Sequence, residues 1–347
     1  MFKRWPGNPI LEPRRNSWWE AAQTRNPAVV LRDGTVHLIY TAAADLDIEH
    51  KLYLGHATSR DGFHFERVSN DPFVQPSAEV FDGFDAGGVE DPRAVTIEST
   101  TYITYCARAM PCWTHHLGGR HPNPPTQGLT WTKNYRRGGL LATEDLMTVR
   151  RLGPVTSDDH YDCNVILFPE QVDGQYLMLH RPSGWEGKDW GASMDSRPAI
   201  YLCTSRDLKT WEEDRPLMLP EFAWEHKIGG GCPPIKTEAG WLVLYHAVES
   251  PPPNGNWHYA YRFCYRAGLA LLDLDNPRKV IARVPHPVLE PESPFEKFGT
   301  VNNVVFPTGH ALLGDELFVY YGAADTVCCV ATVKLRALLE LALRYRL

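Results

Sequence analysis

Two carboxylates, a proline and an arginine stand together in residues 88–93, Gly-Val-Glu-Asp-Pro-Arg, directly before the apolar, β-branched run of residues 94–97. This order places ionisable groups at the start of a predicted strand. A carboxylate in such a position can act as a general acid or base when its surroundings tune its pKa. A plainer role fits the same residues, in which Asp91 and Arg93 pair with each other or cap a turn.

The composition narrows the classes of function. The chain has 347 residues, of which 43% are hydrophobic and 22% charged, and its net charge is -7. These values exclude a disordered chain and a nucleic-acid binder that needs a basic surface, so a small-molecule partner is expected. No stretch approaches the roughly 18 apolar residues of a membrane span. The amino end lacks the apolar core of a signal peptide, and a cytoplasmic location is therefore expected.

Cysteine spacing argues against a metal site. The eight cysteines lie at positions 106, 112, 163, 203, 232, 264, 328 and 329. None of them forms the C-x-x-C spacing that is typical of zinc ligands. We therefore expect reduced thiols, no metal and no cofactor.

The elements that must position the carboxylates are predicted to be strands. Residues 25–31 and 36–41 read as strands separated by the turn Asp33-Gly34, which is a hairpin pattern. Further strands are expected at residues 52–58 and 63–68. The four strands make one antiparallel meander.

The same unit returns four more times. Later copies begin with strands at residues 91–97, 164–169, 231–237 and 303–309. Five such units predict an all-β fold, a five-bladed β-propeller of four-stranded antiparallel blades, as a single catalytic domain over residues 1–347. Residues 334–347 are rich in Leu, Ala and Arg and predict a short C-terminal helix.

A propeller brings distant residues to one place. The innermost strand of each blade borders the central channel, so the leading residues of the five first strands should face one pocket. The candidates are Asn26, Asp91 with Arg93, Cys163 with Asn164, Lys227, and Asn302 with Asn303, joined from the second strands by Tyr40, Arg181, His246 and Asp325. Arg181, Lys227 and His246 together could bind an oxyanion, although His246 alone could equally be structural.

Two long loops carry tryptophan beside glycine. They cover residues 109–128, with Trp113, and residues 183–191, with Trp185. Long loops on one rim of a rigid scaffold commonly build a binding site, and aromatic faces suit the apolar side of a sugar ring. Such loops can also form contacts in a homo-oligomer.

Several motifs resemble those of glycoside hydrolase family 130, the mannoside phosphorylases and related β-mannosidases. The similarity runs from residue 8 to residue 325. It is carried by residues 88–93 (GVEDPR), 167–170 (LFPE), 180–182 (HRP), 227–235 (KIGGGCPPI), 240–246 (GWLVLYH) and 303–307 (NVVFP). The family has a five-bladed propeller, in agreement with the repeat count.

The resemblance implies an activity. Asp91 would be the general acid, donating its proton through the mannose 3-hydroxyl while inorganic phosphate attacks the anomeric carbon with inversion and gives mannose 1-phosphate. Phosphate would then be a co-substrate rather than a cofactor. The implied phosphate-binding residues are Arg181, Lys227, His246, Asn164 and Asp325, and the substrate-binding residues are Asn26, Glu90, Arg93, Tyr40, Trp113 and Trp185.

One position departs from the family pattern. A basic residue is expected just before Asn164, and this chain has Cys163. The loss of a charge-assisted contact favours one alternative, an inverting β-mannosidase that uses water with Glu225 as base. A sugar-binding propeller without catalysis is a second alternative, which the number of ionisable residues converging on one channel disfavours. Phosphorolysis is the preferred prediction because Arg181, Lys227 and His246 are retained. The glycosidic linkage, the acceptor sugar and the oligomeric state do not follow from these residues.

Overall fold

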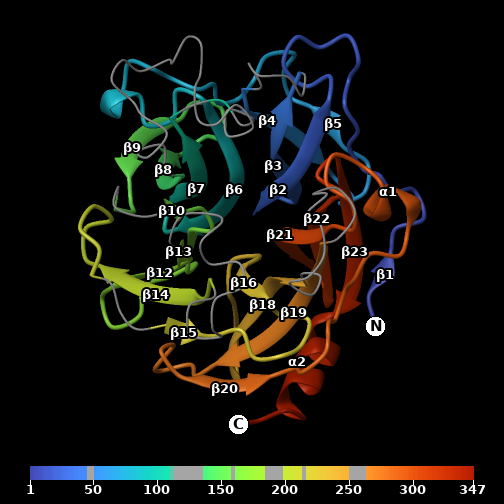
Figure 1. Ribbon diagram of the computed structural model, residues 1–347. Helices are drawn as coiled ribbons and strands as arrows, with labels where there is room; N and C mark the ends of the chain where they lie inside the picture. The colour runs from blue at the N-terminus through green and yellow to red at the C-terminus, as the bar shows by residue number, and fades with distance from the viewer. Residues whose placement is uncertain are drawn as a thin grey trace, which may run out of the picture.

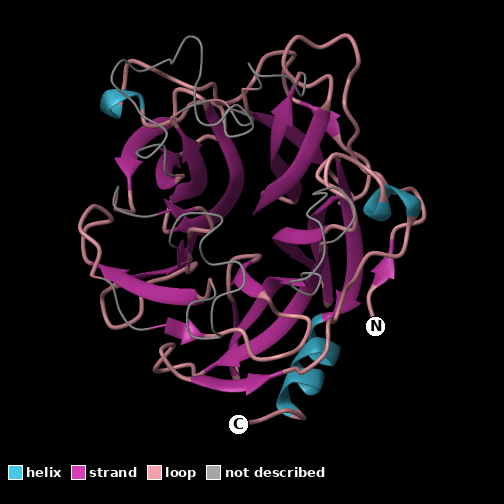
Figure 2. Ribbon diagram, in the orientation of Figure 1, coloured by secondary structure: helices cyan, strands magenta, loops and turns pink. Residues whose placement is uncertain are grey.

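Antiparallel strands succeed one another along the chain and form five blades in a ring (Figures 1 and 2). The middle of this ring, which the innermost strands face, is called the central channel. The computed structural model describes residues 1–44, 51–109, 111, 136–157, 161–183, 198–212, 216–249 and 263–347. The predicted five-bladed propeller is confirmed. No helix in these ranges is long and apolar enough to cross a bilayer.

Each blade runs from an innermost strand at the channel to an outermost strand at the rim. Blade one is β2 (Gln23–Arg32), β3 (Thr35–Ala43), β4 (Tyr53–Ser59) and β5 (Glu66–Arg67); blade two is β6 (Gly88–Ile97), β7 (Thr100–Arg108), β8 (Arg137–Thr143) and β9 (Arg150–Pro154); blade three is β11 (Ile166–Leu167), β12 (Tyr176–His180), β14 (Ile200–Ser205) and β15 (Pro216–Met218). Blade four is β16 (Lys227–Gly230) with β17 (Ile235–Thr237), β18 (Gly240–Glu249), β19 (Cys264–Leu272) and β20 (Val280–Arg283); blade five is β21 (Val305–Leu313), β22 (Glu316–Ala323), β23 (Val327–Lys334) and β1 (Lys3–Arg4). Beside blade three, β10 (Tyr161–Asp162) pairs with β13 (Pro182–Ser183).

The ring is closed by the two ends of the chain. Lys3 and Arg4 of β1 pair with Thr332 and Ala331 of β23, so the amino end supplies the outermost strand of the last blade. This strand was not predicted from the sequence, because two residues are too few to show an alternating pattern.

The innermost strand of blade four differs from the prediction. Residues 231–237 were expected to form one strand, but β16 and β17 pair separately with β18. Pro233 and Pro234 stand between them and have no N–H for the ladder. Lys227, expected just ahead of the blade, is consequently the first residue of its innermost strand.

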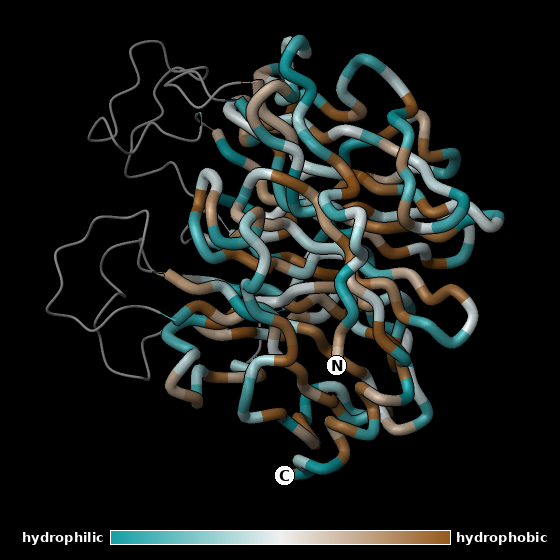
Figure 3. The backbone as a smooth tube through the Cα atoms, turned by 90° about the vertical axis from the view of Figure 1, so that its right-hand side faces the viewer, coloured by the Kyte–Doolittle hydropathy of each residue, from teal (hydrophilic) through white to brown (hydrophobic). Residues whose placement is uncertain are grey.

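The core is divided among the contacts between blades. Hydrophobic stretches recur along the whole backbone tube (Figure 3). Separate buried clusters lie between blades one and two, two and three, three and four, four and five, and five and one. Helix α2 (Leu335–Leu343), which confirms the predicted C-terminal helix, buries Leu338 and Ala342 against the cluster between blades four and five. The short η1 (Phe81–Gly83) and α1 (Pro294–Lys297) lie on connections.

Candidate active site

Bulges in two innermost strands hold the candidate residues at the channel. The pairing register shifts between Arg25 and Ala28 in β2 and between Glu90 and Arg93 in β6. Asn26 and Asp91 lie in these bulges at φ values of 50° and 52°, in the left-handed region that Asn and Asp tolerate. A proline follows each of them and interrupts the ladder. Because a bulge redirects a side chain, the amide and the carboxylate of neighbouring blades meet.

Asp91 is anchored through one of its carboxylate oxygens. Arg25 Nη1 donates to Asp91 Oδ1 at 3.0 Å, and Asn26 Nδ2 donates to the same oxygen at 2.7 Å. The backbone N–H of Asp91 donates to Thr41 Oγ1 at 2.8 Å. The side chain is 15% exposed, and among the described residues no donor reaches Oδ2. The second oxygen can therefore exchange a proton with a molecule in the channel.

Glu90 points to a different set of partners. Its Oε2 accepts from Arg25 Nη2 at 3.0 Å, and its Oε1 accepts from Arg108 Nε at 2.5 Å. Burial acts to raise the pKa of Glu90, but the charges of Arg108 and Arg25 outweigh it and hold this pKa well below its usual range. Glu90 is thus a charged carboxylate that orients Arg25 toward Asp91.

Arg93 crosses the channel. Its Nε donates to the backbone oxygen of Gly231 at 2.5 Å, and its Nη1 donates to the backbone oxygen of Asp91 at 2.8 Å. Blades two and four are not neighbours in the ring, so the first bond spans the centre. The guanidinium lies 5.1 Å from the centre of the Phe306 ring, and within the described ranges its Nη2 has no hydrogen-bond partner. This geometry positions the Asp91 bulge.

A second group of cationic and polar side chains lies in the same channel. Arg181 Nη1 lies 3.2 Å from His246 Nε2, and His246 Nδ1 lies 3.0 Å from the backbone oxygen of Gly230. Burial, and next the charge of Arg181, hold the pKa of His246 well below its usual value; Lys227 and Arg93 add to this effect. His246 is therefore neutral, with its proton on Nδ1 and with Nε2 accepting from Arg181.

Cys163 and Asn164 complete this group. Arg181 Nη2 donates to Cys163 Sγ at 2.9 Å, and both residues are buried. Asn164 is buried beside them, with Oδ1 3.9 Å from Cys163 Sγ. Lys227 Nζ lies 5.7 Å from the centre of the Tyr265 ring. One channel therefore holds a partly exposed carboxylate and a cluster of donors suited to an anion.

The family model of the β-1,4-mannooligosaccharide phosphorylases matches residues 3–344 of the chain. The chain belongs to glycoside hydrolase family 130. The resemblance noted in the motifs is thereby confirmed.

Relatives and solved structures within family 130 agree with this assignment. A 1,2-β-oligomannan phosphorylase of Thermoanaerobacter sp. (strain X514) is 35% identical, covering 96% of this chain and 98% of its own length. The β-1,2-mannobiose phosphorylase of Listeria innocua, solved with β-1,2-mannobiose, superposes with a TM-score of 0.76 at 25% identity and covers 99% of both chains. A structure from work on family 130 hydrolases that target β-1,2-mannosidic linkages in Candida mannan has a TM-score of 0.77 at 25% identity and covers 97% of this chain and 94% of that one.

Asp325 lies near Asp91. Burial raises its pKa, the negative charges of Asp91 and Glu90 add to the rise, and Arg25 opposes it. The resemblance grouped Asp325 with the phosphate-binding residues, whereas its surroundings are those of the general-acid candidate. Asn302, another candidate at the channel, instead accepts a bond from Gly299 N at 3.1 Å in the loop before β21.

Tyr40 corrects one prediction. It is fully buried, and its hydroxyl donates to Glu20 Oε2 at 2.8 Å. Arg67 Nε donates to the same carboxylate oxygen at 3.0 Å. The ring is packed so closely over Gly55 that a Cβ at this glycine would lie 2.3 Å from it. Tyr40 is a core residue of blade one and does not face a substrate.

Glu225 corrects a second prediction. Its Oε1 accepts from Tyr245 at 2.6 Å, and its Oε2 accepts from Arg283 Nη2 at 2.7 Å and from Glu221 N at 2.9 Å. The side chain is fully buried. This is the same arrangement as Tyr40, Glu20 and Arg67, so Glu225 is a structural carboxylate and is not placed to activate water.

The two tryptophans predicted to bind substrate are not among the contacts described above. Trp113 and Trp185 lie outside the described residues. Within the described ranges no group of three or more His, Cys, Asp or Glu side chains is arranged for a metal ion.

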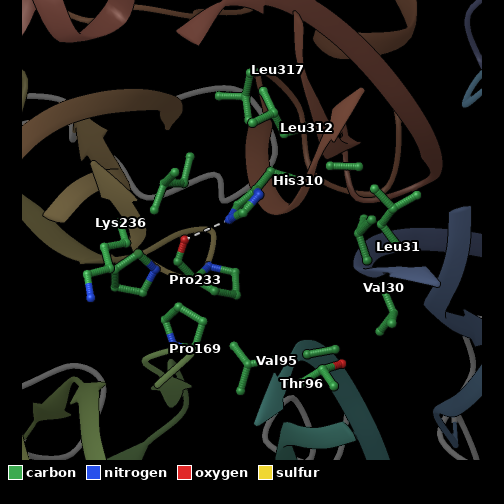
Figure 4. Close-up of a pocket in the computed structure, with 15 residues that line it drawn as sticks. Val30, Leu31, Val95, Thr96, Pro169, Pro233, Lys236, His310, Leu312 and Leu317 are labelled. Carbon is green, nitrogen blue, oxygen red and sulfur yellow. Dashed lines mark hydrogen bonds between the residues drawn. The ribbon is translucent and has the colours of Figure 1, made fainter. Parts of the chain in front are cut away.

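An apolar cavity of about 290 Å³ lies between the innermost strands, farther along them than the two bulges (Figure 4). Its lining includes Val30 and Leu31 of β2 and Val95 of β6, several residues beyond the two bulges along the same strands. His310 points into it and lies 3.0 Å from the oxygen of Pro233. None of the candidate catalytic residues lines this cavity, which separates it from the acid and anion groups.

Arg25, Thr41 and Arg108 were not identified from the sequence. A signal for Arg25 was present, because Arg25-Asn26-Pro27 repeats the pattern of Glu90-Asp91-Pro92. Comparing blades one and two position by position would have placed Arg25 beside Glu90.

Proposed function

We propose that this protein is an inverting phosphorylase that cleaves β-linked manno-oligosaccharides with inorganic phosphate and gives mannose 1-phosphate. The observation that carries the proposal is the cluster of Arg181, His246 and Lys227 in the channel that also holds Asp91. Phosphate is itself a nucleophile, so it needs cationic donors and no second carboxylate base. The family 130 relatives named as phosphorylases support the same reaction.

Asp91 is the proposed general acid. Its anchored Oδ1 and its partly exposed position suit a group that donates a proton to the sugar, in the proposed route through the mannose 3-hydroxyl. Asn26, Arg25 and Asp325 surround it and would contact the mannose unit next to the cleaved bond.

The proposed phosphate site is built on Arg181. Its two Nη atoms contact His246 and Cys163, while its buried Nε has no partner in the described part of the chain. Lys227 and Asn164 supply further donors beside it. Neutral His246 accepts from Arg181 and so orients the guanidinium toward an incoming anion.

We further propose that the substrates carry β-1,2 linkages. The support is that the Thermoanaerobacter relative and the Listeria structure are both named for β-1,2-mannosides. A cytoplasmic location and a homo-oligomeric state stay predictions.

The test is to incubate the protein with β-1,2- and β-1,4-mannobiose, each with and without phosphate, and to identify the products by NMR. We expect mannose 1-phosphate from the β-1,2 substrate only when phosphate is present. Cleavage that is independent of phosphate and releases mannose would instead establish the hydrolase. Sugar binding without turnover would establish the non-catalytic propeller.

A further inference from the structure

Two cysteine thiols meet between blades two and three. Cys106 lies in β7 and Cys163 lies between β10 and β11. They are 1% and 5% exposed, and they form a small buried cluster of their own. The two side chains pack against each other. This pair therefore adjoins the Arg181 end of the proposed phosphate site.

The two thiols differ in their electrostatic surroundings. The adjoining Cys106 thiol, and next the charges of Arg181 and Arg136, lower the pKa of Cys163 to about 6 against the effect of burial. Burial raises the pKa of Cys106 well above its usual value. At neutral pH the pair thus consists of a thiolate held by Arg181 Nη2 at 2.9 Å and a neighbouring thiol. A thiolate in a cationic setting beside a second cysteine is typical of oxidation-sensitive sites.

We propose that Cys106 and Cys163 form an oxidation-sensitive pair, which a peroxide converts to a disulfide and a dithiol restores, and that its state sets the affinity of the adjoining site for phosphate. The second half of the proposal rests on the proposed function. In the first step the Cys163 thiolate attacks one peroxide oxygen, forming an S–O bond, breaking the O–O bond and releasing hydroxide. In the second step the Cys106 sulfur attacks the sulfenic sulfur, and its proton leaves with the displaced hydroxyl as water. Two electrons pass from the sulfurs to the peroxide.

The channel gives the oxidant access. A site that admits phosphate also admits hydrogen peroxide, which is the smaller molecule. Because the peroxide needs to reach only Cys163, Cys106 can stay buried and act as the resolving thiol.

Oxidation should strengthen phosphate binding. The Cys163 thiolate compensates the charge of Arg181 and occupies its Nη2. In a disulfide this sulfur is neutral and is drawn toward Cys106, since an S–S bond is about 2.05 Å long. Arg181 then lacks its anionic partner until phosphate binds, and we expect the Kd for phosphate to fall at least fivefold.

Other cysteines of the chain provide internal controls. Cys232 and Cys328 are equally buried, and each donates to a backbone oxygen at 3.4 Å. Burial raises the pKa of Cys232 to about 12 and raises that of Cys328 as well. Both should stay unreactive thiols under conditions that oxidise Cys163.

The experiment treats the full chain with stoichiometric hydrogen peroxide, blocks the remaining thiols with iodoacetamide and maps the unreduced peptides by mass spectrometry. We expect one cross-link, between Cys106 and Cys163, which dithiothreitol removes. Calorimetry with inorganic phosphate then compares the reduced and oxidised forms. In Cys106→Ser we expect no cross-link, a dimedone-reactive sulfenic acid at Cys163, and no peroxide-dependent tightening of the kind seen in the parent protein.

The outcomes separate the two proposals. Absence of the cross-link, or oxidation of Cys232 and Cys328 at the same rate, would overturn the thiol pair while leaving phosphorolysis intact. A cross-link with unchanged or weaker phosphate binding would overturn its link to the phosphate site. If the reduced protein bound no phosphate at all, the proposed function and the effect on phosphate would fall together, whereas the cross-link would stand.

Discussion

At the scale of single residues, replacement of Asp91, the proposed general acid, gives the most direct test. Asp91→Asn keeps an oxygen that can accept from Arg25 and Asn26, but it removes the proton donor. General acid catalysis is commonly worth about 10²–10⁴-fold, so we expect kcat/KM to fall by about that factor, with the melting temperature little changed.

Asp173→Asn is the matched control for this change. Asp173 is exposed and also has a positive φ, of 52°, in the turn before β12. We expect it to keep full activity. If Asp91→Asn kept more than about a tenth of the parent kcat/KM, which is less than the usual effect of such a group, Asp91 would not be the acid.

Arg181 is expected to act on phosphate more than on sugar. Arg181→Lys keeps the charge but loses the planar fork that contacts His246 and Cys163 together. A charge-assisted hydrogen bond is worth about 1.5–3 kcal/mol, so the KM for phosphate should rise about 10- to 100-fold while the KM for the mannoside changes less. Initial rates over both substrates measure this split. The control is Arg336→Lys, on the exposed surface of α2, which should change neither KM. If Arg181→Lys raised both KM values equally, Arg181 would not belong to the phosphate site.

At the scale of elements, four blades share one internal device. A tyrosine of the second strand donates to a carboxylate that precedes the innermost strand, and an arginine of the outermost strand pairs with the same carboxylate. The sets are Tyr40–Glu20–Arg67, Tyr105–Asp85–Arg151, Tyr245–Glu225–Arg283 and Tyr321–Glu296–Arg4. Blade three has a buried His180–Asp162 pair at 2.6 Å. Each set ties a blade together from its inner to its outer strand.

This device predicts what Glu225→Gln does. Removing the buried charge leaves Arg283 with only the exposed Glu221 carboxylate at 3.4 Å and costs about 3–5 kcal/mol, so urea unfolding should show a large loss of stability. The folded fraction should keep its kcat, because Glu225 does not face the channel. Tyr245→Phe serves as the milder companion, with a cost of about 1–3 kcal/mol. A loss of kcat of more than 100-fold in folded Glu225→Gln would restore the hydrolase with Glu225 as base.

The same elements show how far the sequence could be read. Alternating strands and Asp-Gly turns were enough for five blades, and short motifs in blades two to five, including the one around Asp91, carried the family resemblance. The bulges were not predicted, although Asn26-Pro27 and Asp91-Pro92 are the residues that cause them. Tyr40 was assigned to the channel because strand position alone does not say which face of the pleat a side chain occupies. Glu225 was chosen only for its closeness in sequence to Lys227, which does not show where its side chain points.

At the scale of the whole molecule, pH should affect stability through buried neutral histidines. Burial lowers the pKa of His310, beside the apolar cavity, to about 4, compared with about 6.5 for an unfolded chain. The unfolded state then binds more protons between these values, so the contribution is complete above about pH 6.5 and is lost as the pH falls toward 4. His310→Gln should remove this part of the pH dependence, which amounts to about 3 kcal/mol of unfolding free energy at most. An unchanged slope of unfolding free energy against pH would contradict it.

Closure of the ring is the property that depends on the whole chain, and it rests on Arg4. Arg4 Nε donates to the fully buried Glu296 at 2.8 Å, and its Nη1 donates to Glu292 at 2.9 Å. The neighbouring Trp5 stacks on Phe63 of blade one, with the ring centres 4.3 Å apart. Arg4→Ala leaves the Glu296 charge without this partner and should lower the free energy of unfolding by about 3–5 kcal/mol. The control is Arg336→Ala, which breaks an exposed pair with Glu340 and should lower it by less than about 0.5 kcal/mol. Because Arg4 holds β1 in blade five and the neighbouring Trp5 carries the contact with blade one, hydrogen exchange in Arg4→Ala should rise first in β23 and β2. Uniform exchange across all five blades would show instead that β1 does not close the ring.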